Sequence, residues 1–359
     1  MVSRKGEANE LPTTSIDTFF ACTIIIAAVL ISTTFLTSTL QTTIGGTQDV
    51  NKESYLKAIA DRTVTSPGAP LNWGINGLVP TDFGLAESNS NTPFEIDADK
   101  ITMLNQLNSH YISYAELATA AKLSNIALSI KVSPIMSLVL QQSFNNTNGN
   151  ETSFSFQVLT SVDSEPVSAS LHCYVVGENY LTDTTNITSD VGLGQIAFQM
   201  PVDTIENATL VVFARASCDD RITSYATYNF ANSEQQLASN EDILTASPFN
   251  YTLDLTPHES GINVQGGYLF SFGYEQNLTC VQGNTTFLVP RLIDKSPFVI
   301  LIYGENGNAF FEDWTSYPEI PLSWGSSFQG SEQNVFSYVV TIKDTLYKLD
   351  ISLGAPPTK

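Results

Sequence analysis

Hydrophobic residues follow two different patterns along this chain. Residues 18–40 are mostly apolar and contain no charged side chain, and a run of this length forms a helix that crosses a bilayer core of ~30 Å. From Ser133 onward apolar and polar residues alternate, as at Phe154, Phe156 and Val158, which is typical of half-buried β-strands. The pattern therefore predicts a membrane-spanning helix followed by a mainly β fold.

Between these two regions the sequence predicts short helices. Apolar residues at helical spacing indicate a helix over 51–63. Asp97 is the expected N-cap of a second helix, and Ser113 with Glu116 forms a capping box that begins a third. Asp97 and Asp99 are also candidate calcium ligands, but the glycine and the terminal glutamate of a calcium loop are missing. Helix capping is the favoured interpretation.

These patterns divide the chain into consecutive regions. We expect a cytoplasmic N-terminus over 1–17, a transmembrane helix over 18–40, a membrane-proximal α+β neck over 41–133, a β-sandwich over 134–231 and a C-terminal β domain over 241–359. The polar segment Asn232–Asn240 lacks apolar alternation and predicts a linker. In the last region, 335–342 and 346–351 predict two strands of a hairpin that turns at 343–345.

Composition and charge exclude some classes of protein and of binding partner, and they predict the orientation of the chain in the membrane. The chain has 359 residues, of which 42% are hydrophobic and 14% charged, and this excludes a disordered protein. Its 15 basic and 36 acidic residues give a net charge of −21, which excludes a nucleic-acid partner. Arg4 and Lys5 are the only cations before the apolar run, so the N-terminus is expected inside the cell and the remainder outside.

An extracellular location predicts modified asparagines. All sequons of the form Asn-x-Ser/Thr follow the apolar run, and they lie at Asn145, Asn150, Asn186, Asn207, Asn250, Asn277 and Asn284. Each is a candidate N-glycosylation site, because such sequons are modified on exposed turns and strand edges.

Two of the cysteines are candidates for a disulfide bond, because the environment outside the cell is oxidising. Cys173 and Cys218 fall on the hydrophobic parity of their predicted strands, so both are expected to face the core. A disulfide between them would stabilise the sandwich, and Cys280 would then stay unpaired. The two other pairings of these exterior cysteines remain open. The thiols and histidines are too far apart in sequence for a zinc motif.

Catalytic motifs are missing from the sequence. The three histidines, His110, His172 and His258, are widely separated, and the sequence has no nucleophile elbow, phosphate loop or dinucleotide fingerprint. We therefore expect a protein that is not an enzyme and uses no cofactor, although a triad assembled from distant loops stays open.

One aromatic stretch is a candidate binding site. Trp314, Tyr317 and Trp324 lie close to the carboxylates of Glu312 and Asp313. Aromatic faces beside carboxylates can stack on sugars and accept hydrogen bonds from their hydroxyls, so these three aromatic residues are candidate glycan contacts. The alternative is that they anchor a long loop onto its sheet.

The N-terminus resembles a known export signal. Arg4–Glu7, followed by residues 15–21, is similar to the class III signal of archaeal type IV pilin-like proteins. The resemblance implies processing between Gly6 and Glu7, a retained apolar helix and a homo-oligomer formed through it. The polar stretch before the apolar run is longer than in that family, so an uncleaved signal anchor is the alternative.

Further resemblances concern the exported region. Residues 66–74, 83–86, 96–101 and 111–117 resemble the membrane-proximal region of archaeal surface proteins. Residues 165–171 and 188–198 are similar to immunoglobulin-like and transthyretin-like modules, which implies an immunoglobulin-like sandwich over 134–231.

The sequence favours a non-enzymatic, single-pass cell-surface protein. Its expected role is that of a pilin-like structural or assembly component of the cell envelope. The alternative is a stalked adhesin or glycan-binding protein, and an envelope-bound enzyme is a distant third. The expected partners are membrane lipid, further copies of the chain, and surface glycans or other envelope proteins.

Overall fold

The computed structural model describes residues 52–178, 180–202, 208–230, 243–282, 285–291, 297–307, 309–328 and 333–356. The chain divides into two compact units, residues 1–58 and 59–359. Of the first unit, residues 52–58 are described, and they are helical. Within the part of the chain that is described, no helix is long and apolar enough to span a bilayer.

Several sequence predictions lie outside the described residues. They are the transmembrane helix at 18–40, the processing site at Gly6 and Glu7, the sequons Asn207 and Asn284, and the linker at 232–240.

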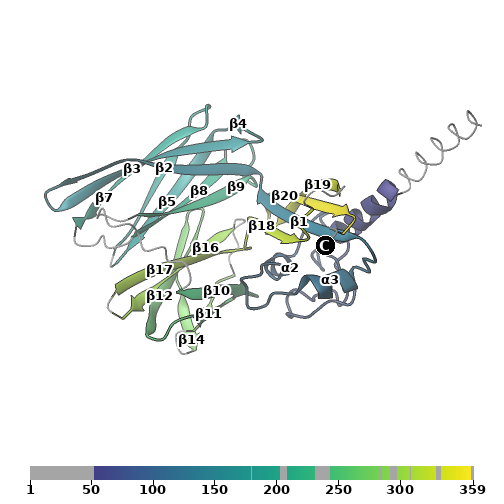
Figure 1. Cartoon of the computed structure of the whole chain (residues 1–359). Helices are drawn as coiled ribbons and strands as arrows, with labels where there is room; N and C mark the ends of the chain where they lie inside the picture. The colour runs from purple at the N-terminus through teal and green to yellow at the C-terminus, as the bar shows by residue number, and fades with distance from the viewer. Residues whose placement is uncertain are drawn as a thin grey trace, which may run out of the picture. The chain divides into compact units, whose positions relative to one another are not determined.

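Two antiparallel sheets pack face to face in the predicted β-sandwich region (Figure 1). The first contains β2 (Met136–Asn148), β3 (Glu151–Val162), β4 (Glu165–Pro166) and β7 (Leu193–Pro201). The second has the order β6 (Tyr180–Ile187), β5 (Ala169–Gly177), β8 (Ala208–Ala216) and β9 (Thr223–Phe230). Alternate residues such as Phe156 and Val212 fill the space between them. The β-sandwich expected from the period of two is confirmed.

A third sheet packs on the other face of the second one. Its order is β13 (Tyr274–Asn277), β12 (Ile262–Ser271), β16 (Phe298–Asn306) and β17 (Ala309–Tyr317). Tyr174 and Phe213 contact Phe270 and Leu301 across this interface. Since the second sheet is buried on both faces, its strand β8 is apolar at almost every position rather than at every second one.

Two further sheets complete this unit. One has the order β10 (Leu244–Phe249), β11 (Thr252–Pro257), β15 (Thr286–Leu288) and β14 (Thr279–Gln282). The other has the order β18 (Leu322–Gly325), β1 (Ala127–Pro134), β20 (Thr345–Gly354) and β19 (Gln333–Ile342).

The expected domain boundaries do not separate compact units. Strand β1, which ends the predicted neck, pairs along its whole length with β20 near the C-terminus. The sandwich and the C-terminal β region share the double-sided sheet, and all of 59–359 is one unit. The sequence pattern misplaced the boundaries because it shows that a strand is buried but does not show what covers it.

Local signals in the sequence are confirmed at the helices and the hairpin. Asp97 caps α2 (Ala98–Thr102) by accepting hydrogen bonds from the N–H groups of Asp99 and Lys100. Ser113 and Glu116 form the predicted capping box of α3 (Tyr114–Ala120). The predicted C-terminal hairpin is β19–β20, and its turn is Lys343–Asp344, where both residues have the positive φ of a type I′ turn.

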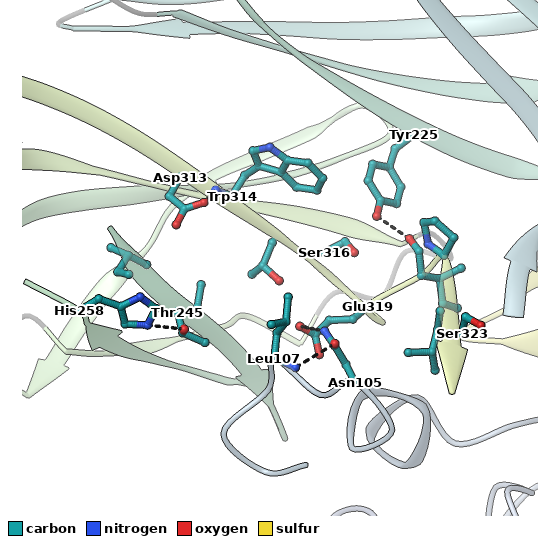
Figure 2. A pocket seen from close by; sticks show the side chains of 16 residues that line it. Asn105, Leu107, Tyr225, Thr245, His258, Asp313, Trp314, Ser316, Glu319 and Ser323 are labelled. Atoms are coloured by element: carbon teal, nitrogen blue, oxygen red, sulfur yellow. Dashed lines mark hydrogen bonds between the residues drawn. The ribbon is translucent and has the colours of Figure 1, made fainter. Parts of the chain in front are cut away.

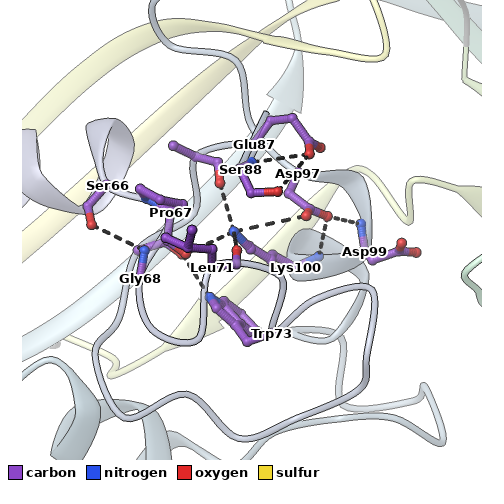
Figure 3. A network of polar contacts seen from close by, with 12 residues as sticks. Ser66, Pro67, Gly68, Leu71, Trp73, Glu87, Ser88, Asp97, Asp99 and Lys100 are labelled. Carbon is purple, nitrogen blue, oxygen red and sulfur yellow. Dashed lines mark hydrogen bonds and ion pairs between the residues drawn. The ribbon is translucent and has the colours of Figure 1, made fainter. Parts of the chain in front are cut away.

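The buried side chain of Lys100 forms hydrogen bonds with several of the loops that precede α2 (Figure 3). Lys100 is fully buried, and its Nζ donates hydrogen bonds to the carbonyls of Pro67, Leu71 and Ala86 at 2.9, 3.2 and 2.7 Å. Its Nζ also lies 4.0 Å from the Asp97 carboxylate. An ammonium group has three N–H donors, so all of them are used inside the fold.

Candidate functional site

A cavity of about 480 Å³ lies where β17 meets β10, β9 and the segment 318–323 (Figure 2). Its wall includes Trp314, Asp313, His258, Asn105 and Glu319. These residues come from separate parts of the sequence, and the packing of the sheets brings them together. The cavity is within the size range of small-molecule sites.

The edge strand β17 supplies the aromatic wall of the cavity. Trp314 is half-buried, lies opposite Leu301 of β16, and meets Tyr225 of β9 edge to face at a centroid distance of 6.4 Å. Neighbouring side chains of a strand point to opposite faces of its sheet. Trp314 and Asp313 therefore extend from opposite faces of β17, and both line the cavity at the edge of the sheet. One part of the indole packs in the core, and the rest lines the cavity.

Two carboxyl groups give the cavity its polar character. Burial raises the pKa of Asp313 to about 6, although its Oδ1 accepts a hydrogen bond from the Trp314 N–H at 2.7 Å. Burial raises the pKa of Glu319 to about 7, while the side-chain amides of Asn105 and Asn108 donate to its two oxygens at 2.9 Å each. Both groups therefore take up a proton at a higher pH than an exposed carboxyl group does.

A histidine and a threonine stand on the other side of the cavity. His258 Nε2 is 2.7 Å from Thr245 Oγ1, and the positive form of His258 lowers the pKa of Asp313. Figure 2 shows this pair beside Asp313 and apart from Glu319. The wall thus combines one aromatic face with carboxyl, amide, imidazole and hydroxyl groups. Such a combination suits a ligand that has both apolar faces and many hydroxyl groups.

Of the three predicted glycan contacts, only Trp314 lines the cavity. Tyr317 is 2% exposed, and its hydroxyl donates to Asp99 Oδ1 at 2.7 Å. Trp324 is also 2% exposed, and its ring packs on Phe83 and Tyr114. The prediction is wrong for Tyr317 and Trp324, because both side chains are buried in the core. They lie in strands β17 and β18 rather than in the long loop that the alternative interpretation assumed.

The sequence predictions did not include Asn105, Thr245, His258 or Glu319 as site residues. Glu319 lies within the aromatic stretch, between Tyr317 and Trp324, so the argument that selected Glu312 and Asp313 applied to it as well. The other three carry no local signal, because their place in the cavity depends on sheet packing.

The described sequons differ in accessibility. Asn145, Asn150 and Asn277 are exposed. Asn186 is also exposed, but its side-chain amide donates to the carbonyl of Gln195. Asn250 is half-buried in a tight turn, so the exposed asparagines fit the predicted modification better.

The predicted Cys173–Cys218 disulfide is absent from the structure. Both thiols are free, with Cys173 buried and Cys218 exposed. Cys173 lies opposite Val212 of β8. Strand β8 ends at Ala216, ~13 Å further along the strand direction, and Cys218 lies beyond that end. A disulfide requires Cα atoms within ~7 Å. The parity argument failed because β8 ends at Ala216, so its alternation does not place the Cys218 side chain on the core face.

Comparison with known proteins adds little. No family model matches the chain, and no curated protein matches it. Among solved structures, HBP35 of Porphyromonas gingivalis matches with 13% sequence identity and a TM-score of 0.20. The match covers 50% of this chain and 63% of that chain, which is less than two thirds of its length. A likeness this small carries no argument about fold or function.

Proposed function

We propose that this chain is a single-pass cell-surface protein whose exported β region binds a glycan in the Trp314 cavity. The observation that carries the proposal is the half-buried Trp314 indole, which lines the same cavity as Asp313, Asn105 and Glu319. The indole can stack on a sugar ring, while the polar groups can exchange hydrogen bonds with its hydroxyls. In this proposal the sandwich of 134–231 is an immunoglobulin-like module that helps carry the cavity.

A glycan array tests this function. The full chain in detergent is expected to bind a subset of glycans, and Trp314→Ala and Asp313→Asn are each expected to remove most of that binding. Phe144→Ala is the matched control, because Phe144 is 53% exposed on β2 and does not line the cavity. The proposal fails if the wild-type chain binds no glycan, or if folded Asp313→Asn and Trp314→Ala bind as the wild type does.

The second candidate is assembly into a pilin-like structure. It is supported by the uncharged apolar run at 18–40 and by the similarity of Arg4–Glu7 to a pilin-like signal. Further copies of the chain would then associate through the retained helices. Charged substitutions between Ile24 and Phe35 are expected to dissociate detergent-resistant polymers. A wild-type chain that is monomeric in every detergent would rule out this candidate.

A further inference from the structure

Strand β19 has a free edge on the outside of its sheet. The sheet order is β18-β1-β20-β19, so among the described strands β19 pairs only with β20. The tight turn at Lys343–Asp344 makes Ile342 and Thr345 a hydrogen-bonded pair. Backbone groups of a strand point to alternate sides, so the N–H and C=O groups of Val335, Ser337 and Val339 point away from β20.

One contact confirms this direction and marks where the free edge ends. Thr341, which has the same parity, donates its N–H to the carbonyl of Phe94 at 3.0 Å and accepts the N–H of Ile96 at 2.8 Å. The outward backbone groups of β19 can therefore form hydrogen bonds with a further strand. The segment Phe94–Ile96 takes up only the groups of Thr341, at the end of β19. From Val335 to Val339 the backbone bonds of the described residues leave the edge open.

The side chains on this edge are uncharged, and two of the outward-facing ones are apolar. Val335 is 52% exposed and Val339 is 60% exposed. All ten residues of β19, Gln333–Ile342, are uncharged, although the chain carries a net charge of −21. Natural edge strands usually carry charges, prolines or bulges that prevent pairing. A second copy of so acidic a chain would be repelled at most of its surface, but an uncharged strand avoids this.

We propose that two copies of this chain pair edge to edge through β19, in antiparallel register about Ser337. A two-fold axis at Ser337 places Val335 opposite Val339 of the second copy, and Phe336 opposite its Tyr338. Each hydrogen-bonded pair exchanges two backbone bonds, so the three outward-facing pairs form about six. The strand is self-complementary on both faces, with valine pairs on one and aromatic pairs on the other.

Charged residues lie beside the paired segment but not within it. Asp61 accepts a hydrogen bond from the Tyr338 hydroxyl at 2.8 Å, and Glu95 is bridged to Thr341 beyond the open part of the edge. Asp350 accepts a hydrogen bond from Ser337 Oγ at 2.5 Å and lies 3.7 Å from Lys348. Both belong to β20, so the two copies of each are separated by the pair of β19 strands. The pairing rests on β19 alone and does not depend on glycan binding.

Register-specific cross-linking tests the pairing in the full chain. The background carries serine at Cys22, Cys218 and Cys280, and a short thiol cross-linker is applied to the protein in detergent. Ser337→Cys is expected to give a covalent dimer, because the Cα atoms of a hydrogen-bonded pair are ~5.5 Å apart. Val339→Cys alone is not expected to give a covalent dimer, because residue 339 of one copy lies ~13 Å along the strand from residue 339 of the other.

Two further variants separate this pairing from association through other surfaces. Val335→Cys combined with Val339→Cys is expected to cross-link, although neither does so alone. Adding Val339→Lys to Ser337→Cys is expected to reduce the yield of covalent dimer at least tenfold. Adding Leu159→Lys to Ser337→Cys is expected to leave that yield unchanged. Leu159 is the matched control because it is 43% exposed on β3, a strand paired on both sides. The proposal is overturned if Ser337→Cys gives no more dimer than Leu159→Cys, or if Val339→Cys alone cross-links equally well.

Discussion

At the residue scale, buried ionisable groups mark where the fold depends on specific partners. Lys100 is enclosed by three carbonyls and Asp97. Glu312 of β17 is buried and accepts a hydrogen bond from Thr209 of β8 at 2.6 Å. The second contact joins the double-sided sheet to the sheet of the candidate site. Each group makes the stability of the protein sensitive to a single substitution or to pH.

Replacing the buried lysine is expected to be costly. Lys100→Met removes the donor to three carbonyls and leaves the Asp97 carboxylate without its cation, so we expect a loss of roughly 3–5 kcal/mol in the free energy of unfolding. Lys131→Met is the control, since Lys131 is exposed on β1, and it is expected to change stability by less than ~0.5 kcal/mol. Urea denaturation of both variants measures the difference. Equal, small effects would contradict the structural role of Lys100.

Stability is expected to fall as the pH rises. Burial raises the pKa of Glu312 to about 8, above the ordinary value of 4.5 that applies to the unfolded chain. The folded state therefore binds the proton more tightly, and the resulting stabilisation is complete below pH ~4.5 and is lost as the pH rises through 8. Glu319 and Asp313 act in the same direction, with pKa values of about 7 and 6.

The melting temperature between pH 5 and pH 8 checks this sign. It is expected to decrease with pH in the wild type and to decrease less in Glu312→Gln, which cannot ionise. Glu305→Gln removes an exposed carboxylate of β16 and serves as the control. A wild-type protein that becomes more stable from pH 5 to pH 8 would contradict the account.

At the element scale, the central feature is a sheet with both faces buried. Residues of one parity in β5 and β8 pack on the β2-β3-β7 sheet, and residues of the other parity pack on the β12-β16 sheet. The alternation at Cys173 and Val212 predicted one of these faces. The second face, with Tyr174 and Phe213, was visible only as a higher apolar content, which does not identify the covering sheet.

Because the sheets share this element, we expect 59–359 to unfold cooperatively. Phe270 is fully buried and stacks on Tyr174 at 4.6 Å. Phe270→Ala is expected to cost ~3–5 kcal/mol, and to increase hydrogen exchange in β3 as well as in β12. Phe144→Ala, at an exposed position, is the control. An increase confined to β12 would instead support the separate domains expected from the sequence.

At the scale of the whole molecule, sequence and structure account for different parts of the protein. Strand periodicity, helix caps and the β19–β20 hairpin were predictable because each depends on residues close together in sequence. The β1–β20 pairing and the Trp314 cavity were not, because they join residues that lie far apart along the chain. The membrane helix and the processing site remain predictions from the sequence at 18–40 and Arg4–Glu7.

Tryptophan fluorescence tests the proposed glycan binding most directly. The chain has three tryptophans, and Trp73 and Trp324 are buried, with exposures of 0% and 2%. Of the three tryptophans, Trp314 is the one that a glycan in the cavity can contact. Titration with a bound glycan is therefore predicted to shift the emission of the wild type and to leave Trp314→Phe unchanged. A glycan that binds without any shift, or a shift that persists in Trp314→Phe, would contradict the assignment of this site.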